Sequence, residues 1–308
     1  MRIAIMGSGG VGGYFGARLA LGGADVTFIA RGRHLAAMQE HGLRIESELG
    51  DMHLREVKAT DDPASIGPVD LVMIGVKLWD TEHAARQILP LVERGAGVIS
   101  FQNGVQKDEI LRGLVGDAPL LGGVSYIAAI IKEPGVILQT GRMQRLIFGE
   151  FDGSLSPRAT MFLEACKAGG IDAELSTDIS RAIWEKFVLL VGLSGATSAT
   201  RLPIGPIRDN PQSRAFLLDL MRETEAVGRA LGVNLPDNFA EDRLAFLDGV
   251  PARMTSSMSN DLERGNPLEV AWLSGNVVEL GQSAGVPTPC NRAVAAILAP
   301  HAAGGVDL

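Results

Sequence analysis

The glycine-rich stretch GSGGVG at residues 7–12 constrains the fold more than any other feature of this sequence. An apolar run at residues 2–6 precedes it. A helical pattern at residues 14–21 follows it, and a second apolar run occupies residues 25–30. Glycines between a buried strand and a helix permit a tight turn and let the main chain approach a phosphate group. The sequence therefore predicts a strand–turn–helix–strand unit that binds a dinucleotide, with a purely structural turn as the alternative.

Strand and helix patterns continue to alternate through the first half of the chain, as in a sheet covered by helices on both faces. Apolar runs at residues 69–76 and 97–101 predict two further buried strands. Residues 120–131 and 136–148 look extended, and we expect them to pair through the turn at residues 133–135. A small hairpin is also expected in the more polar region before Thr60.

From about Thr177 onward the strand pattern stops, and apolar residues recur only at helical spacing. We therefore predict an α/β protein, with a Rossmann-type dinucleotide-binding domain at residues 1–175 and an all-helical domain at residues 176–308. Thr177 or Asp178 is expected to cap a long helix that runs through Ser194. The other predicted helices lie at residues 35–41, 81–91, 157–168, 212–231, 239–247, 252–263, 267–284 and 291–298.

Composition excludes several classes of protein. A net charge of −8 offers no broad basic surface to nucleic acid. No apolar run approaches the roughly 20 residues that span a bilayer. Only two cysteines are present, Cys166 and Cys290, and no cluster of His, Cys or acidic residues has the spacing of a metal site. We predict a cytoplasmic protein with no metal, membrane or nucleic-acid partner, which could form a homodimer through its helical half.

The end of the second predicted strand indicates which dinucleotide is bound. An NAD site commonly carries an acidic residue here that binds the ribose hydroxyls. This chain has Arg31 and Arg33 instead, about 20 residues beyond the glycine stretch. A guanidinium pairs well with a 2′-phosphate, so the sequence favours NADP(H), with solvated surface charge as the alternative.

Several motifs, in this order, resemble those of the ketopantoate reductase (2-dehydropantoate 2-reductase) family. They are GSGGVG, FIARG, GVKLWD, SFQNGV, IWEKF and SSMSNDLERGNPLEV, which together extend over almost the whole chain. The resemblance implies an active site in a cleft between a Rossmann domain and a helical domain. It also implies NADPH-dependent reduction of a 2-oxo acid to a 2-hydroxy acid, with ketopantoate to pantoate, a step of pantothenate biosynthesis, as the lead reaction.

The resemblance also assigns the catalytic pair. Lys186, in an otherwise apolar helical segment, matches the family lysine that protonates the nascent alkoxide, although a lysine there could also extend to solvent. Glu269 matches a glutamate that contacts the coenzyme or positions this lysine. Glu269 has a structural alternative as well, because Asn266-Pro267-Leu268-Glu269 is close to a helix-capping box.

The remaining site residues follow from the same resemblance. Asn103 and Lys77 each follow a predicted strand at the edge where α/β sheets bind ligands. The alternatives are that Asn103 belongs to an ordinary Asn-Gly turn and that Lys77 is a solvated surface lysine. The residues assigned to the coenzyme are Gly7, Ser8, Gly9, Gly10, Val11, Gly12, Arg31, Lys77, Asn103, Ala129 and Glu269. Those assigned to the substrate are Lys186, Asn103, Ser194 and Ser257.

The chain departs from the family pattern at three positions. The family usually has asparagine where this sequence has Leu190, Ser194 and Ile204. Replacing an amide by leucine removes hydrogen-bonding groups and adds apolar volume, which changes substrate selectivity. The sequence therefore leaves open a reductase of another 2-oxo acid or of a less polar ketone, and a non-catalytic NADP(H)-binding redox sensor.

Overall fold

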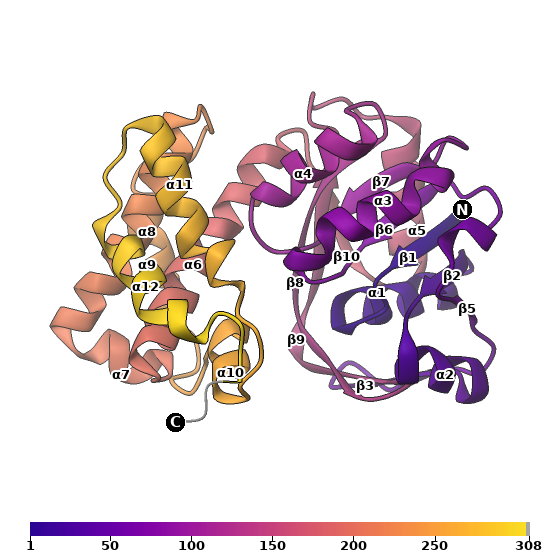
Figure 1. The fold of residues 1–308 in the computed structure, drawn as a ribbon, viewed down its shortest axis with the longest axis horizontal. Helices are drawn as coiled ribbons and strands as arrows, with labels where there is room; N and C mark the ends of the chain where they lie inside the picture. The colour runs from indigo at the N-terminus through magenta and orange to yellow at the C-terminus, as the bar shows by residue number, and fades with distance from the viewer. Residues whose placement is uncertain (306–308) are drawn as a thin grey trace. The chain divides into compact units, whose positions relative to one another are not determined.

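The structure is a computed structural model that describes residues 1–305. It divides into two compact units (Figure 1). The first comprises residues 1–103 and 107–182, and the second comprises residues 104–106 and the chain from Ile183 onward. A mixed β-sheet and its helices form the first unit, whereas the described part of the second contains helices only. The predicted fold class, a Rossmann-type α/β domain followed by a helical domain, is therefore confirmed.

Parallel strands form the half of the sheet that begins at the N-terminus. Their spatial order is β5-β2-β1-β6-β7-β8, which is the order of dinucleotide-binding folds. The order reverses between β1 and β6, and ligands of such sheets bind at the carboxyl ends of the strands next to this point. These strands are β1 (Arg2–Met6), β2 (Asp25–Ile29), β5 (Lys58–Thr60), β6 (Leu71–Ile74), β7 (Gly97–Ser100) and β8 (Leu120–Glu133).

A long hairpin extends the sheet beyond this parallel part. Strand β9 (Val136–Gly149) runs antiparallel to β8, so the predicted pairing through the turn around Gly135 is confirmed. Strands β3 (Leu43–Ser47) and β4 (Met52–Leu54) form the small hairpin expected before Thr60, and β3 pairs with β9. The edge strand β10 (Asp172–Leu175) was not predicted.

The helices of the first unit match the predicted positions with three exceptions, of which one is that α2 begins at Gly32 rather than at residue 35. Helix α1 begins at Gly10, earlier than predicted, because the glycines at its start carry low helix propensity yet form its first turn. Helix α4 was not predicted at all. The hydroxyl of Ser156 accepts a hydrogen bond from the amide of Ala159, as its predicted cap role requires. The helices are α1 (Gly10–Leu21), α2 (Gly32–His41), α3 (Thr81–Val92), α4 (Gln106–Val115) and α5 (Pro157–Ala168).

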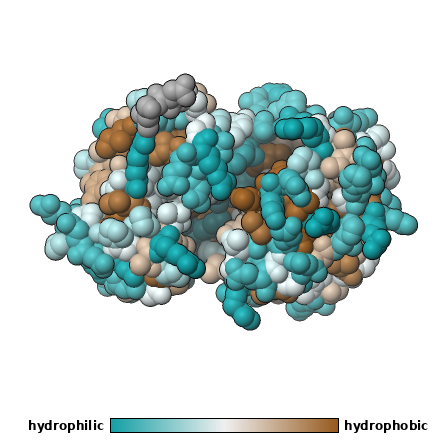
Figure 2. Space-filling model, turned by 90° about the horizontal axis from the view of Figure 1, so that it is seen from below, coloured by the Kyte–Doolittle hydropathy of each residue, from teal (hydrophilic) through white to brown (hydrophobic). Residues whose placement is uncertain are grey.

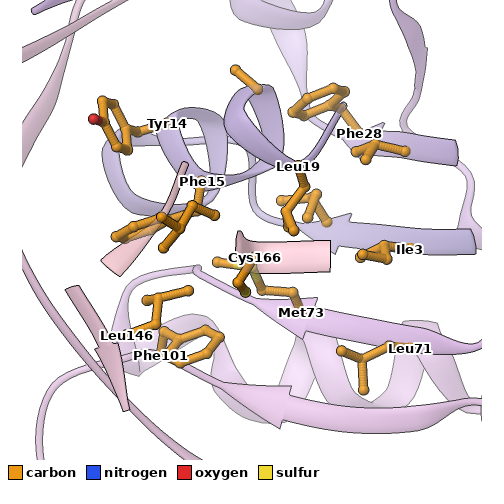
Figure 3. Packing of buried hydrophobic residues seen from close by; sticks show 14 of the residues in the cluster. Ile3, Tyr14, Phe15, Leu19, Phe28, Leu71, Met73, Phe101, Leu146 and Cys166 are labelled. Carbon is orange, nitrogen blue, oxygen red and sulfur yellow. The ribbon is translucent and has the colours of Figure 1, made fainter. Parts of the chain in front are cut away.

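The core of the first unit holds α1 against the sheet (Figure 3). Phe15 and Leu19 of α1 are fully buried in one apolar cluster with side chains from the strands, among them Ile3 and Met73. Cys166 of α5 belongs to the same cluster. Burial of α1 along its length fixes the position of its N-terminus at the carboxyl end of β1.

Helix α6 (Ile179–Thr200) enters the second unit and is followed by the remaining helices. Asp178 accepts a hydrogen bond from the amide of Arg181, so it is the residue that caps α6. The later helices are α7 (Ile204–Asp209), α8 (Pro211–Ala230), α9 (Phe239–Asp248), α10 (Ser257–Glu263), α11 (Ser274–Ala284) and α12 (Pro289–Leu298). Helix α7 was not predicted.

Two predicted helix starts in this unit are wrong. The helix expected from residue 252 begins only at Ser257, because the carbonyls of Ala252 and Met254 accept hydrogen bonds from the start of α7. The helix expected at residues 267–284 is interrupted. A short 3₁₀ turn at Glu269–Ala271 comes first, and Leu273, with ψ at −102°, separates that turn from α11.

The surface visible in Figure 2 is largely hydrophilic, with smaller hydrophobic areas between the polar side chains. Exposed large apolar residues include Ile130 and Ile131 on β8 and Met143 on β9. Among the described helices, none combines the length and apolar character that a bilayer span requires.

Candidate functional site

The three glycines of the predicted fingerprint lie in three different environments. Gly7 has φ at +95°, and a Cβ there would lie 2.6 Å from a methyl of Val76. A Cβ on Gly12 would lie 2.1 Å from the carbonyl oxygen of Gly7, so this glycine permits close packing of helix on strand. Around Gly9, apart from its two chain neighbours, no described residue would have an atom within 4 Å of a Cβ. Gly9 therefore borders open space, as a glycine that faces a phosphate must.

The amides at the start of α1 face the same place. Gly9 is the N-cap of α1 and, within the described chain, no side chain caps it. The first N–H groups of a helix have no partner inside the helix, and the helix dipole favours an anion there. The local structure at Gly9 and Gly10 thus offers backbone donors to a phosphate.

The neighbours of these glycines hold the loop in shape. The carbonyl of Ile29 accepts hydrogen bonds from the amides of Gly7 and Ser8, both at 3.2 Å, and from the Ser8 hydroxyl at 3.1 Å. A Cβ on Gly10 would lie 2.1 Å from the carbonyl oxygen of Ala129. Gly10 and Ala129, both assigned to the coenzyme from sequence, are therefore in direct contact through their backbones.

Arg31 follows β2 directly and is the N-cap residue of α2. Its side chain is 65% exposed, and its guanidinium lies 3.3 Å from the carboxylate of Asp80. Asp80 comes from the segment after β6, so this ion pair joins the carboxyl ends of two strands. Arg33, two residues further along in the first turn of α2, is also exposed.

The carboxyl ends of β6 and β7 bring Lys77 and Asn103 to the same edge of the sheet. Lys77 is exposed, and its ammonium lies 5.6 Å from the centre of the Trp79 ring. Gln102, which no sequence pattern indicates, is buried between the two segments. Its side-chain amide donates to the carbonyls of Val76 at 3.0 Å and of Lys77 at 3.4 Å. Gln102 therefore connects the backbones that carry the two predicted site residues.

In the second unit, Lys186 lies on α6 and is half-buried. The rings of Trp184 and Phe187 pack edge to face, 5.5 Å apart, and anchor this turn of the helix in the core. Leu190 and Ser194 follow Lys186 at intervals of four residues, which places all three on one side of α6. The Ser194 hydroxyl is buried and has no hydrogen-bond partner among the described residues.

The predicted capping box at Glu269 is wrong. Asn266 does not cap a helix, because the turn that follows has Leu268 as its N-cap residue. The backbone and side-chain amides of Asn266 donate instead to the backbone and the side chain of Asp261. Glu269 instead opens the short 3₁₀ turn, and the residue is 7% exposed. A buried glutamate outside a cap is consistent with its other predicted role.

Ser257 is the first residue of α10 and is exposed. The serine before it, Ser256, is buried, and its hydroxyl lies 2.9 Å from that of Thr197 on α6. Ile204, the third position that departs from the family pattern, is fully buried at the start of α7. Within the described chain, no group of three or more His, Cys, Asp or Glu side chains could hold a metal ion.

Comparison with known proteins adds independent information. The family model described as "Ketopantoate reductase PanE/ApbA" matches residues 3–153, and the model of its C-terminal part matches residues 178–302. The 2-dehydropantoate 2-reductases of Archaeoglobus fulgidus and Mesorhizobium japonicum are 34% and 31% identical to this chain. The alignments cover 94% and 97%, respectively, of both chains.

Solved structures agree with these matches. A PanE/ApbA family ketopantoate reductase from Ralstonia eutropha superimposes with a TM-score of 0.89 and is 34% identical, over 98% of both chains. A D-mandelate dehydrogenase solved with NADH and anilino(oxo)acetate has a TM-score of 0.88 over 98% of both chains. At 19% identity, that second likeness concerns the fold alone.

Proposed function

Because the chain belongs to the ketopantoate reductase family, and is therefore a nicotinamide-dependent oxidoreductase, we propose that it reduces a 2-oxo acid with NADPH. Ketopantoate is the lead substrate and pantoate the product. The observation that carries the proposal is the open space beside Gly9 at the uncapped start of α1, within a sheet of dinucleotide-binding order.

The residues present fit a dinucleotide. Gly9 leaves room for a pyrophosphate, and the amides that begin α1 would bind it. Lys77 and Asn103, joined through Gln102, follow the strands beside the point where strand order reverses. That position suits them to the nicotinamide end of the coenzyme.

Arg31 supports NADPH rather than NADH. It follows β2, where the adenosine ribose of a bound dinucleotide lies in this fold. Its guanidinium is two-thirds exposed and can turn toward a 2′-phosphate, and Arg33 adds positive charge nearby. No acidic residue occupies the end of β2 itself, where NAD enzymes bind the ribose hydroxyls.

Lys186 and Glu269 carry the proposed proton transfer. When bound, the coenzyme supplies a hydride to the ketone carbon. The ammonium of Lys186 donates its proton to the ketone oxygen as negative charge develops there, which yields the hydroxyl of the 2-hydroxy acid. Glu269 orients this amine. Lys186 is suited to the role because its helix is anchored on both sides by Trp184 and Phe187.

A second candidate is a reductase of the same fold for a less polar 2-oxo acid or ketone. The side of α6 that carries Lys186 presents the apolar Leu190, and Ile204 is buried without a polar group. Only the hydroxyl of Ser194 is left to bind a polar substituent at these three positions. This composition supports a substrate with a larger apolar part than ketopantoate.

The test is a panel of 2-oxo acids, with ketopantoate included, in which NADPH oxidation is followed by absorbance. We expect turnover with at least one member, and loss of that turnover in Lys186→Ala with NADPH affinity retained. Lys167→Ala is the matched control, because this exposed lysine on α5 forms an ion pair with Glu164 on its own helix. NADPH binding without turnover on any member would favour the sensor, and near-normal turnover in Lys186→Ala would remove the lysine from its role.

A further inference from the structure

Both ring nitrogens of His34 are engaged in hydrogen bonds. His34 lies in α2, half-buried, with Nε2 2.9 Å from the carbonyl oxygen of Ser8 and Nδ1 3.1 Å from the backbone nitrogen of Gly135. A carbonyl only accepts and a backbone N–H only donates. The two contacts together require a neutral imidazole that carries its proton on Nε2.

These bonds join three segments that are distant in sequence. Ser8 belongs to the glycine loop, 26 residues before His34, and Gly135 lies in the turn between β8 and β9, 101 residues after it. The loop also rests on β8, through the contact of Gly10 with Ala129. The imidazole thus connects the glycine loop, through Ser8, to the turn of the β8–β9 hairpin, through Gly135.

We propose that His34 is a positioning residue for the coenzyme, whose neutral ring holds the Ser8 carbonyl and thereby fixes the direction of the amides at Gly9 and Gly10. The inference rests on the proposed binding of NADPH to this loop. Protonation of Nδ1 would bring its N–H toward the backbone N–H of Gly135, and the two donors would repel each other. The ring would therefore move, and its hydrogen bond to the Ser8 carbonyl would weaken. The structure therefore predicts an affinity for coenzyme that declines in acid.

The electrostatic surroundings place this change below neutrality. Burial lowers the pKa of the His34 imidazole, and the hydrogen bond to Ser8 opposes this only in part. The charged and titratable side chains along the packed segments are Arg31, Arg33, Glu40 and His41 on the histidine's side, Lys58 on β5, Arg44 and Glu46 on β3, and Lys132 and Glu133 before Gly135, whereas the glycine loop has none. The imidazole is hence neutral at any pH above its lowered pKa. Its hydrogen bonds to Ser8 and Gly135 are lost as pH falls through that pKa.

Two substitutions separate the bonds. The amide nitrogen of Gln in His34→Gln can reach the position of Nε2 and keep the bond to Ser8. The carbonyl oxygen of Asn in His34→Asn can take the position of Nδ1 and keep the bond to Gly135. His34→Ala keeps neither, and His83→Gln, at an exposed histidine on α3, is the matched control.

The measurement is the Kd for NADPH by fluorescence titration at pH 7.5, with thermal unfolding recorded in parallel. We expect His34→Ala and His34→Asn to raise Kd by about three- to tenfold, the effect of one buried hydrogen bond. His34→Gln should stay within about twofold of the parent, as should the control. Equal Kd values in all variants, with only the unfolding temperature changed, would show that the histidine is merely structural and overturn the proposal.

The pH profile supplies a second readout. The 2′-phosphate of NADPH itself gains a proton near pH 6, so both parent and His34→Gln should bind more weakly in acid. We expect the parent to lose affinity more steeply between pH 7.5 and 5.5, because only it also protonates the ring. Superimposable profiles would contradict the role of His34. Failure of the parent to bind NADPH at pH 7.5 would instead reject the proposed function and, with it, this inference.

Discussion

The side-chain amide of Gln102 donates a 2.8 Å hydrogen bond to the hydroxyl of Thr81. The same amide bonds the carbonyl of Val76, and its oxygen accepts from the hydroxyl of Ser100 at 3.0 Å. One buried side chain thus ties the carboxyl end of β7 to the start of α3. Lys77 and Asn103 lie on the two segments that it joins.

Replacing Gln102 by Leu, which has a similar volume, should therefore affect both stability and activity. Buried polar groups of Thr81, Val76 and Ser100 would lose their partner, at a cost of about 2 kcal/mol in the free energy of unfolding. We also expect kcat/KM to fall at least about tenfold, because a small displacement of Lys77 and Asn103 would misalign the coenzyme and slow the reaction. Gln39→Leu, at an exposed residue whose side-chain amide donates to the carbonyl of Ala59, is the control. Equal kcat/KM in both variants would deny Gln102 a positioning role.

The glycine fingerprint should separate binding from folding. Gly9 has a φ of −74° and ψ of −158°, which alanine adopts readily, and open space surrounds it. Gly9→Ala should fold normally yet raise the Kd for NADPH at least about tenfold, because a methyl would enter the phosphate position. Gly12→Ala should lower the unfolding temperature, because its Cβ would collide with the backbone of Gly7. A Gly9→Ala protein with unchanged affinity would place the coenzyme elsewhere.

Most of the first unit could be predicted from sequence, since strands buried on both faces read as short apolar runs. β1 and the pairing of β8 with β9 show this well. The start of α1 was misplaced because Gly10 and Gly12 oppose helix formation locally, and only packing against Gly7 and Ala129 explains their place in the helix.

The errors in the second unit also have a tertiary cause. Residues 252–256 have helical spacing, but the carbonyls of Ala252 and Met254 accept hydrogen bonds from the start of α7. Likewise, the amide of Leu268 bonds the carbonyl of Ala302, far along the chain, which helps to keep residues before Glu269 out of a helix. No local sequence pattern predicts hydrogen bonds between segments so far apart in the chain.

The same reason explains which site residues were missed. The glycine loop and Arg31 occur in motifs whose spacing is local. Gln102 and His34 act through hydrogen bonds to residues that the fold alone brings near, such as Gly135. Neither side chain belongs to a local sequence motif, so only the structure identifies their roles.

Asp80 should limit the preference for NADPH. Its carboxylate partly neutralises Arg31, 3.3 Å away, and would repel a 2′-phosphate. We expect Asp80→Asn to lower the Kd for NADPH by about two- to fivefold at low salt, and less at high salt because the pair is exposed. The Kd for NADH, which lacks the phosphate, should not change. An equal change for both coenzymes would mean that Asp80 acts on the loop rather than on the phosphate.

The two cysteines should differ in reactivity. Burial raises the pKa of the Cys166 thiol to about 12. Burial, followed by the charge of Glu223, raises that of Cys290 to about 11. Since the thiolate is the reactive form, both thiols should react slowly at pH 8. Cys290, which is partly exposed, should label first with a thiol reagent, and Cys166 only on unfolding. Rapid labelling of Cys166 in the folded protein would refute the packing of α5 described above.

The stability of the first unit should depend on pH through Glu150. Burial alone would raise the pKa of this carboxyl, but hydrogen bonds from Arg158 and Ser156 and the charge of Arg158 outweigh it, so the pKa is lowered. Arg158 donates to both carboxylate oxygens, at 2.7 and 2.6 Å. A carboxyl with a lowered folded-state pKa stabilises the protein above its unfolded-state pKa, and this contribution is lost as pH falls through the folded-state value.

Glu150→Gln should accordingly reduce the free energy of unfolding at pH 7 by about 2 kcal/mol, because a charge-assisted pair becomes a neutral one. The difference from the parent should shrink below about pH 4, where the parent carboxyl also gains a proton. Urea unfolding across this range measures both effects. Glu164→Gln removes the exposed pair with Lys167 and should change stability by less than about 0.5 kcal/mol at any pH. A constant difference between parent and Glu150→Gln from pH 7 to pH 3 would show that the charge of Glu150 is not what stabilises the junction of β9 and α5.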